Sequence, residues 1–205
     1  MHPALSRWLS LALGHTVTLM QIGYLADHQE FIPTVAHWHH REWAYLRPGD
    51  SIEARTARLR ECCGHHEIPT VIIAFTGGTL LGSAMLIAHD MDTRMELSPW
   101  LAGVFVAPER RCLGIGAALV RRVIDEGTAL GVRRLYLYTP STEQFYSRLG
   151  WLLVEHTRYR ALRQHPAKTA TTEPNRILSP SFNSTSVIKT PLTCVPFVES
   201  KSFSR

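Results

Sequence analysis

Two arginines and two glycines between residues 110 and 116 have the types and the spacing to bind a phosphate group. Arg110 and Arg111 precede Gly114 and Gly116, and helical periodicity begins where the glycines stand. The first turn of a helix has N–H groups without intrahelical partners and carries partial positive charge. Glycine lets a bulky anion come close to the backbone. This stretch is therefore predicted to bind a pyrophosphate.

A strand and a helix must position that loop. Residues 101–106 form an apolar block of strand length, and Pro108, which cannot continue a central strand, follows them. Beyond the loop, apolar residues share one helical face and charged residues share the other. The apolar positions are Leu119, Val120, Val123, Ile124 and Leu130, and the charged positions are Arg121, Arg122, Asp125 and Glu126. The chain thus passes from a strand through an Arg/Gly turn into an amphipathic helix.

Two common kinds of pyrophosphate site do not fit these residues. The Lys-Ser/Thr pair of a P-loop NTPase is absent. A dinucleotide-binding loop needs a third glycine, where Leu119 stands, and an acidic residue about twenty residues further on, which is also missing.

The pattern Arg-x-x-Gly-x-Gly at 111–116 resembles the acetyl-CoA pyrophosphate loop of the GNAT (Gcn5-related) N-acetyltransferase superfamily. Residues 132–138 (Val-Arg-Arg-Leu-Tyr-Leu-Tyr) resemble the fifth strand of that family. Residues 145–151 (Phe-Tyr-Ser-Arg-Leu-Gly-Trp) resemble its Phe-Tyr-x-x-x-Gly-Phe signature. The three come in the family's order, which makes the combination specific. The resemblance extends faintly upstream to about residue 16 and stops near residue 160.

The resemblance implies an α/β (α+β) fold, with a mixed central sheet and helices on both faces. The order of elements predicted from the sequence, β-α-α-β-β-β-α-β-α-β, agrees with it. Strands are predicted over 17–24, 70–75, 80–88, 101–106, 134–138 and 151–159, and helices over 27–45, 52–64, from the glycine pair to 130, and 143–149. Ser51 or Asp50 is predicted to cap the second helix.

The end of the chain departs from the family, whose last strand inserts between the fifth and sixth. Residues 161–205 contain no glycine, and 18 of these 45 residues are Ser, Thr or Pro. Such a segment buries little apolar surface to offset its ordering entropy. We therefore expect an N-terminal extension over 1–15, a domain over 16–160 and a mostly disordered basic tail over 161–205, with the last strand altered or missing. Residues 186–189 or 193–198 could supply a surrogate strand.

The resemblance also implies that acetyl-CoA is the acetyl donor. The strand would lend backbone groups to the pantetheine arm and N–H groups to the thioester carbonyl, and the loop would hold the pyrophosphate. The residues assigned to the donor are Val104, Phe105, Val106, Arg110, Arg111, Cys112, Leu113, Gly114, Ile115, Gly116 and Ala117. The family often has glycine where Cys112 stands, and Cys112 would crowd the loop if a positive φ is needed there.

Acetyl transfer to an amine needs a base for the amine proton and an acid for the leaving thiolate. Tyr146, in the signature, matches the family's general acid. The base is left open: His89 and Asp90 close a predicted strand, and Glu96 precedes the central strand. Glu42, on the first helix, is a further candidate.

Composition limits the other classes of function. The net charge is +5, but residues 1–160 hold 16 basic and 15 acidic residues, whereas residues 161–205 hold 6 and 2. The excess charge therefore belongs to the tail, where it indicates a solvated segment before it indicates nucleic acid. The His-rich stretches 37–40 and 62–66 match no zinc spacing, so no metal is expected.

Four cysteines without CxxC spacing fit free thiols in a reducing cytosol, and no apolar run reaches spanning length. We therefore expect a cytoplasmic, acetyl-CoA-dependent N-acetyltransferase that acts by direct transfer on a primary amine of a small molecule or peptide. The alternative is a catalytically weak acyl-CoA-binding or regulatory protein with an incomplete fold. The open edges of such a sheet would also allow a homodimer.

Overall fold

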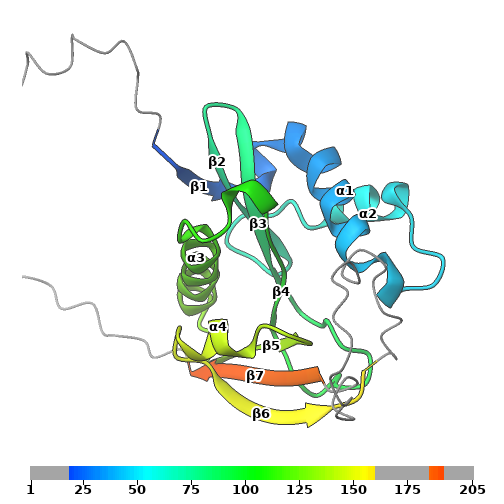
Figure 1. Cartoon of the computed structure of the whole chain (residues 1–205), viewed down its shortest axis with the longest axis vertical. Coiled ribbons are helices and arrows are strands. Elements are labelled where there is room, and N and C mark those ends of the chain that lie inside the picture. The colour runs from blue at the N-terminus through cyan, green and yellow to red at the C-terminus, as the bar shows by residue number, and fades with distance from the viewer. Residues whose placement is uncertain (1–18, 160–184, 192–205) are drawn as a thin grey trace, which may run out of the picture.

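The computed structural model describes residues 19–159 and 185–191 of the chain (Figure 1). The strands are β1 (Gln21–Tyr24), β2 (Thr70–Thr76), β3 (Thr79–Ile87), β4 (Trp100–Val106), β5 (Arg134–Thr139), β6 (Leu152–Thr157) and β7 (Thr185–Pro191). The α-helices are α1 (Ile32–Trp43), α2 (Ile52–Glu61), α3 (Ile115–Ala129) and α4 (Glu143–Ser147). In this part of the chain, no helix is both long and apolar enough to cross a membrane.

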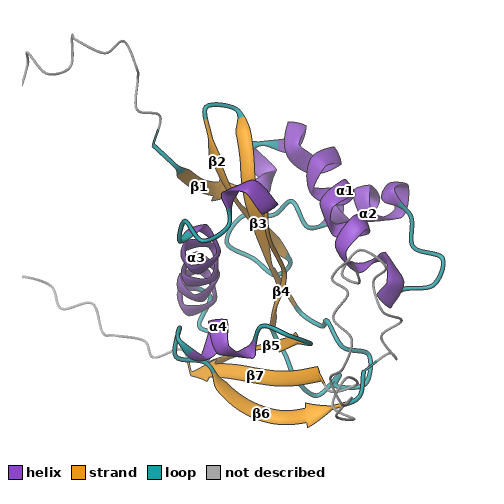
Figure 2. Cartoon of the chain, viewed as in Figure 1, coloured by secondary structure: helices purple, strands orange, loops and turns teal. Residues whose placement is uncertain are grey.

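The strands form one mixed sheet in the order β1-β2-β3-β4-β5-β7-β6. All neighbours are antiparallel except β4 and β5, which are parallel and pair at one position, Trp100 opposite Tyr136. Beyond that pair the two strands diverge, as Figure 2 shows. The backbone of β4 is therefore left without a strand on its β5 side.

Two apolar cores cover opposite faces of the sheet because successive side chains of a strand point to opposite faces. In β2, Ile72 and Ala74 pack in the core formed with α3, whereas Val71, Ile73 and Phe75 pack in the core formed with α1 and α2. Figure 1 shows α3 on one side of the sheet and α1 and α2 on the other. This confirms the predicted fold class.

The last strand is not missing: of the two expectations, altered or missing, the structure supports the first, because β7 begins only at Thr185, well after β6 ends at Thr157. β7 lies between β5 and β6 and pairs with both in antiparallel register. Val187 and Ile188 are buried. Two apolar side chains are enough to hold this short strand in the sheet because it has a neighbouring strand on each side. The surrogate strand predicted at 186–189 is thus confirmed, and the one predicted at 193–198 lies outside the described residues.

Local signals set the helix ends. The Ser51 side chain caps α2 by accepting a hydrogen bond from the Ala54 N–H at 3.1 Å, as predicted. The first helix is shorter than predicted: short 3-10 turns occupy 25–31, and α1 begins at Ile32, with Pro33 in its first turn. Proline has no N–H to lose in that turn, so it favours a helix start there.

Candidate active site

The loop between β4 and α3 presents backbone N–H groups at the start of a 15-residue helix. Gly114 is the N-cap and has φ of +81°, a left-handed conformation that suits glycine. The first hydrogen bond of the helix runs from the Ala118 N–H to the Gly114 carbonyl at 3.0 Å. The N–H groups of residues 115–117 precede that bond and are therefore available to an anion.

Side chains of the loop play different parts. The Arg111 Nε donates a hydrogen bond to the Val106 carbonyl at 3.1 Å, and its guanidinium lies 5.8 Å from the centre of the Phe105 ring. Arg111 thus ties the loop back to β4. Arg110 is exposed and has no ion pair with any described residue, so its charge is available to a ligand.

Cys112 does adopt a positive φ, of 62°, the situation anticipated from the sequence. Its side chain is exposed, so the thiol does not fill the loop. Ile115, by contrast, is buried in the core under α3, and only its backbone faces the loop. A methyl group on Gly116 would lie 3.5 Å from Phe145 and 3.6 Å from Val106, so the first turn of α3 lies close against β4 and α4.

A bulge interrupts β4 where it faces the interior. Ser83 pairs with Phe105 and Met85 pairs with Ala102, so Gly103 and Val104 together oppose a single residue of β3. Gly103 has φ of +56°, and a Cβ there would lie 2.9 Å from His39 Cε1. Only glycine fits this position without displacing its neighbours.

His39 holds this bulge in place, a role that sequence reasoning missed. Its Nε2 lies 2.9 Å from Ser83 Oγ, and Ser83 Oγ donates a hydrogen bond to the Gly103 carbonyl at 3.4 Å. Burial, with the nearby Arg55, lowers the pKa of His39 to about 3. The imidazole is therefore neutral at neutral pH, and with so low a pKa it is a weak proton acceptor.

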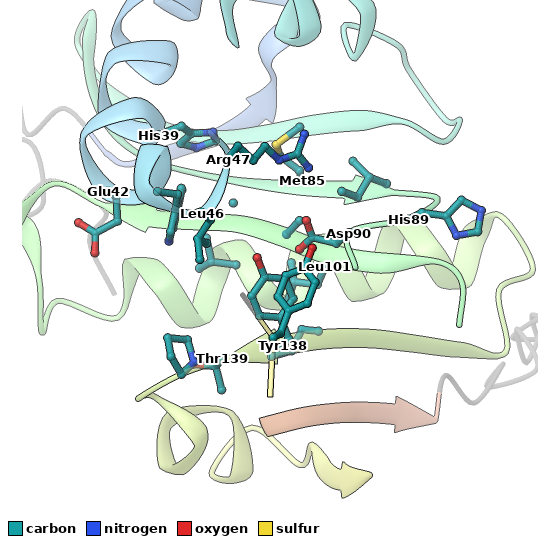
Figure 3. Close-up of a pocket in the computed structure, with 18 of the residues that line it drawn as sticks. His39, Glu42, Leu46, Arg47, Met85, His89, Asp90, Leu101, Tyr138 and Thr139 are labelled. Atoms are coloured by element: carbon teal, nitrogen blue, oxygen red, sulfur yellow. The ribbon is translucent and has the colours of Figure 1, made fainter. Parts of the chain in front are cut away.

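A cavity of about 620 Å³ opens beside the bulge, between the diverging strands and the α1–α2 layer (Figure 3). It brings together residues that are far apart in the chain. Those used below are His39, Glu42, Arg47, Arg55, Arg58, Leu46, Met85, His89, Asp90, Leu101, Gly103, Val104, Tyr138, Thr139 and Tyr146. Of the sequence-predicted donor residues, Val104 lines the cavity, whereas residues 110–117 do not line it and follow the C-terminal end of β4.

Tyr146 enters the cavity from α4. Its ring packs edge-on against Phe145 and Trp151, and only 8% of the residue is exposed. Burial raises the pKa of the phenol, so the group is protonated throughout the physiological range. In the part of the chain that the structure describes, no other group forms a hydrogen bond with its hydroxyl, which leaves the proton available.

The three residues predicted as candidate bases occupy different surroundings. Asp90 points into the cavity, and burial raises its pKa to about 6 although the nearby Arg47 opposes this shift. His89 is exposed, and Figure 3 shows its ring turned away from the other labelled side chains. Glu96 does not line the cavity: its side chain is 68% exposed, 4.0 Å from Arg94. The structure thus brings only Asp90 of the three into contact with the enclosed space through its side chain.

Among the residues with described positions, no group of three His, Cys, Asp or Glu side chains could hold a metal ion. The donor-side features instead suit a phosphate-bearing thioester. Free N–H groups stand at a helix start, an uncommitted arginine lies beside them, and an unpaired strand edge leads to the cavity.

Comparison with known proteins gives a fold and a family. Three solved structures are similar in fold. YncA of Salmonella typhimurium, solved with its cofactor acetyl-CoA, is 15% identical with a TM-score of 0.58, over 86% of this chain and 95% of that one. A phosphinothricin acetyltransferase of Sinorhizobium meliloti, in complex with acetyl-CoA, is 19% identical with a TM-score of 0.58, over 86% and 89%. The ribosomal-protein-S18-alanine N-acetyltransferase of Escherichia coli is 16% identical with a TM-score of 0.55, over 90% and 100%.

No curated protein matches the sequence. A model of the acetyltransferase (GNAT) family, however, matches residues 32–151, which span α1 to the Phe-Tyr signature and include the Arg/Gly loop before α3 and all the described cavity-lining residues except Tyr159. The family model covers more than half of the chain, so the chain belongs to the acetyltransferase (GNAT) family, and acetyl-CoA is its acetyl donor.

Proposed function

We propose that this protein is an N-acetyltransferase that moves the acetyl group of acetyl-CoA directly to a primary amine, with Asp90 as base and Tyr146 as acid. The observation that carries the proposal is that one cavity holds the β4 bulge, a carboxylate with a raised pKa and a protonated phenol. These are the three groups that thioester aminolysis needs in one place.

The backbone of the chain would place the donor. The N–H groups of residues 115–117 and the Arg110 guanidinium would bind the pyrophosphate, and the unpaired side of β4 would bind the arm that leads to the thioester. When bound, acetyl-CoA supplies an acetyl group activated as a thioester. The bulge at Gly103 and Val104 turns backbone groups of β4 towards the cavity, where an N–H could polarise the carbonyl.

Asp90 is the base in this proposal because it is ionised at pH 7 and its pKa lies close to that pH. With a pKa of about 6 it is mostly deprotonated at pH 7, and it is a stronger proton acceptor than a carboxylate of ordinary pKa. It would take the proton of the acceptor ammonium, directly or through one water. Glu42 also lines the cavity, and Figure 3 shows its carboxylate turned away from Asp90 and Tyr138.

Tyr146 would act on the leaving sulfur. Its hydroxyl is protonated and has no competing partner among the described side chains, so it can donate to a thiolate as negative charge develops. The ring packs against Phe145 and Trp151, which fixes the position of the hydroxyl oxygen. A fixed donor needs no reorganisation during the reaction.

The alternative of a weak acyl-CoA-binding protein depended on an incomplete sheet. β7 occupies the place of the strand thought to be missing, so that observation no longer favours the alternative. The similar structures include enzymes named for a small molecule and for a ribosomal-protein alanine, so both small and peptide amines belong in the test.

The proposal is tested by measuring thiol release from acetyl-CoA in the presence of a panel of small and peptide amines. Tyr146→Phe removes only the hydroxyl, so we expect kcat to fall about 10- to 100-fold while the Kd for acetyl-CoA is unchanged. Tyr136→Phe is the matched control, because Tyr136 is buried on β5 and does not line the cavity.

Equal turnover in Tyr146→Phe and wild type would remove Tyr146 as the acid. If acetyl-CoA binds tightly but no amine of the panel releases thiol, the alternative of a binding protein replaces the proposal.

A further inference from the structure

One end of the cavity has more arginine side chains than carboxylates that form ion pairs with them. Arg55 Nε lies 2.5 Å from Asp50 Oδ2, and Arg58 also pairs with the same carboxylate. The Asp50 side chain is 1% exposed, and its pKa is low although burial opposes this, because the two arginines donate hydrogen bonds to it. This wall of α2 therefore holds two guanidinium groups against one carboxylate.

Arg47, in the connection between α1 and α2, adds a third guanidinium. Across the described residues its side chain forms neither an ion pair nor a hydrogen bond, and it is exposed to the cavity. Its positive charge acts on two neighbours: it opposes the rise that burial causes in the pKa of Asp90, and it adds to the lowering that burial causes in the pKa of Arg55. Figure 3 shows it reaching over the cavity between the His39 and Asp90 sides.

An unpaired guanidinium at the wall of a binding cavity constrains what can bind there. In the free protein it is hydrated, but a ligand that covers it must supply hydrogen-bond acceptors or leave a desolvated charge. Arginine presents donors in a rigid fork that matches a carboxylate. The ligand is thus expected to bring an anionic group to Arg47.

The charges that face the cavity here point to a kind of ligand. Arg55 and Arg58 share Asp50, which leaves Arg47 and Asp90 as one cation and one carboxylate at the cavity wall. A molecule with one ammonium and one carboxylate keeps that balance, whereas a phosphorylated amine or a polyamine does not. Leu46, Met85 and Leu101 lie between the charged groups and offer an apolar surface to the rest of the molecule.

We infer that the acceptor is a small amine that also bears a carboxylate, an amino acid or a close relative, with the carboxylate on Arg47 and the amine facing Asp90. This inference rests on the proposed function and goes beyond it by naming the class of acceptor and the residue that selects it.

The test compares standard amino acids with their carboxamides and with the corresponding decarboxylated amines, at saturating acetyl-CoA, by thiol release. In the wild type we expect kcat/KM for the acids to exceed that for the amides by about tenfold or more, the worth of one charge-assisted bidentate contact. Arg47→Gln is expected to abolish this ratio by raising KM for the acids. Arg47→Lys, which keeps the charge and loses the fork, should fall between the two.

Arg60→Gln is the matched control, because Arg60 is exposed on the same helix as Arg55 and Arg58 but does not line the cavity. It should keep the wild-type ratio. Equal rates for acids and amides in the wild type, or an unchanged ratio in Arg47→Gln, would overturn the inference and leave N-acetyl transfer intact. Absence of thiol release with every amine would instead remove the proposed function, and the inference with it.

Discussion

The proposed donor site and the proposed acceptor site use different kinds of chemical group. On the donor side most groups offered to a ligand are backbone, namely N–H groups at the start of α3 and the unpaired side of β4, and Arg110 adds one charged side chain. Ile115 and Phe105 are buried. On the acceptor side they are charged side chains, above all Asp90 and Arg47, set on a connection and a loop. A backbone site depends on φ and ψ and tolerates many side chains, whereas a side-chain site depends on residue identity.

The largest effect should come from the acceptor side, where the proposed mechanism assigns a chemical step to one side chain. Asp90→Asn keeps the size of the residue and removes the base, so we expect kcat to fall by about 10²- to 10⁴-fold with little change in the Kd for acetyl-CoA. Thiol release and calorimetric titration measure the two quantities. Asp125→Asn, on the exposed face of α3, is the charge-matched control.

The pH profile separates this role from a structural one. Because Asp90 must be deprotonated to act and has a pKa of about 6, kcat/KM should fall about tenfold per unit below that pH and level off above it. Asp90→Asn should lose that acidic limb. A profile with the same limb in both proteins would assign the base to another group, such as Glu42.

The next effect tests whether the donor side depends on backbone conformation. Gly114→Val places a β-branched residue at φ of +81°, which costs about 1–2 kcal/mol, so the start of α3 should shift and acetyl-CoA should bind about tenfold more weakly or not at all. The open space around Gly114 means that the effect would come from φ and not from a clash inside the protein.

Gly131→Val is the control for that experiment. Gly131 has φ of +74° at the other end of α3 and is equally open, so its replacement should lower the free energy of unfolding without touching acetyl-CoA affinity. If both variants bind acetyl-CoA like the wild type, the loop is not the phosphate site.

The smallest effect should come from Cys112, whose thiol is exposed and whose φ is 62°. Cys112→Gly removes the backbone strain of a non-glycine residue at positive φ, which stabilises the folded state. It also raises the conformational entropy of the unfolded chain, and the two effects on the free energy of unfolding nearly cancel. Affinity for acetyl-CoA should change by less than about twofold. A large loss of affinity for acetyl-CoA, measured by the same titration, would mean that the donor side depends on the Cys112 side chain.

The same contrast explains what could be predicted from the sequence. The donor side is local: a strand, a Pro/Gly-punctuated loop and an amphipathic helix follow one another within residues 101–130, so their order reveals the site. The acceptor side is assembled by packing. His39 and Ser83 form a hydrogen bond although they are 44 residues apart in the chain, and the sequence around each residue does not predict the contact.

Among the candidate bases, Asp90 and Glu96 could not be separated by pattern, because both lie beside predicted strands. Only burial of Asp90 next to Tyr138 and Arg47 distinguishes them. The position of the last strand, β7, could not be predicted firmly from the sequence for a related reason. β7 has few apolar residues of its own and is specified by the two strands that flank it, not by its local composition.

The placement of β7 also sets an order of events during synthesis. β5 and β6 do not pair with each other, and both obtain their ladder from a segment that ends at residue 191. A nascent chain can close the α3 side and its phosphate loop early, but the half of the sheet that flanks Tyr146 must wait until that segment has left the ribosome. A translation stop before residue 185 would therefore leave a chain that contains the loop before α3 but lacks the strand that completes the sheet beside Tyr146, the proposed acid.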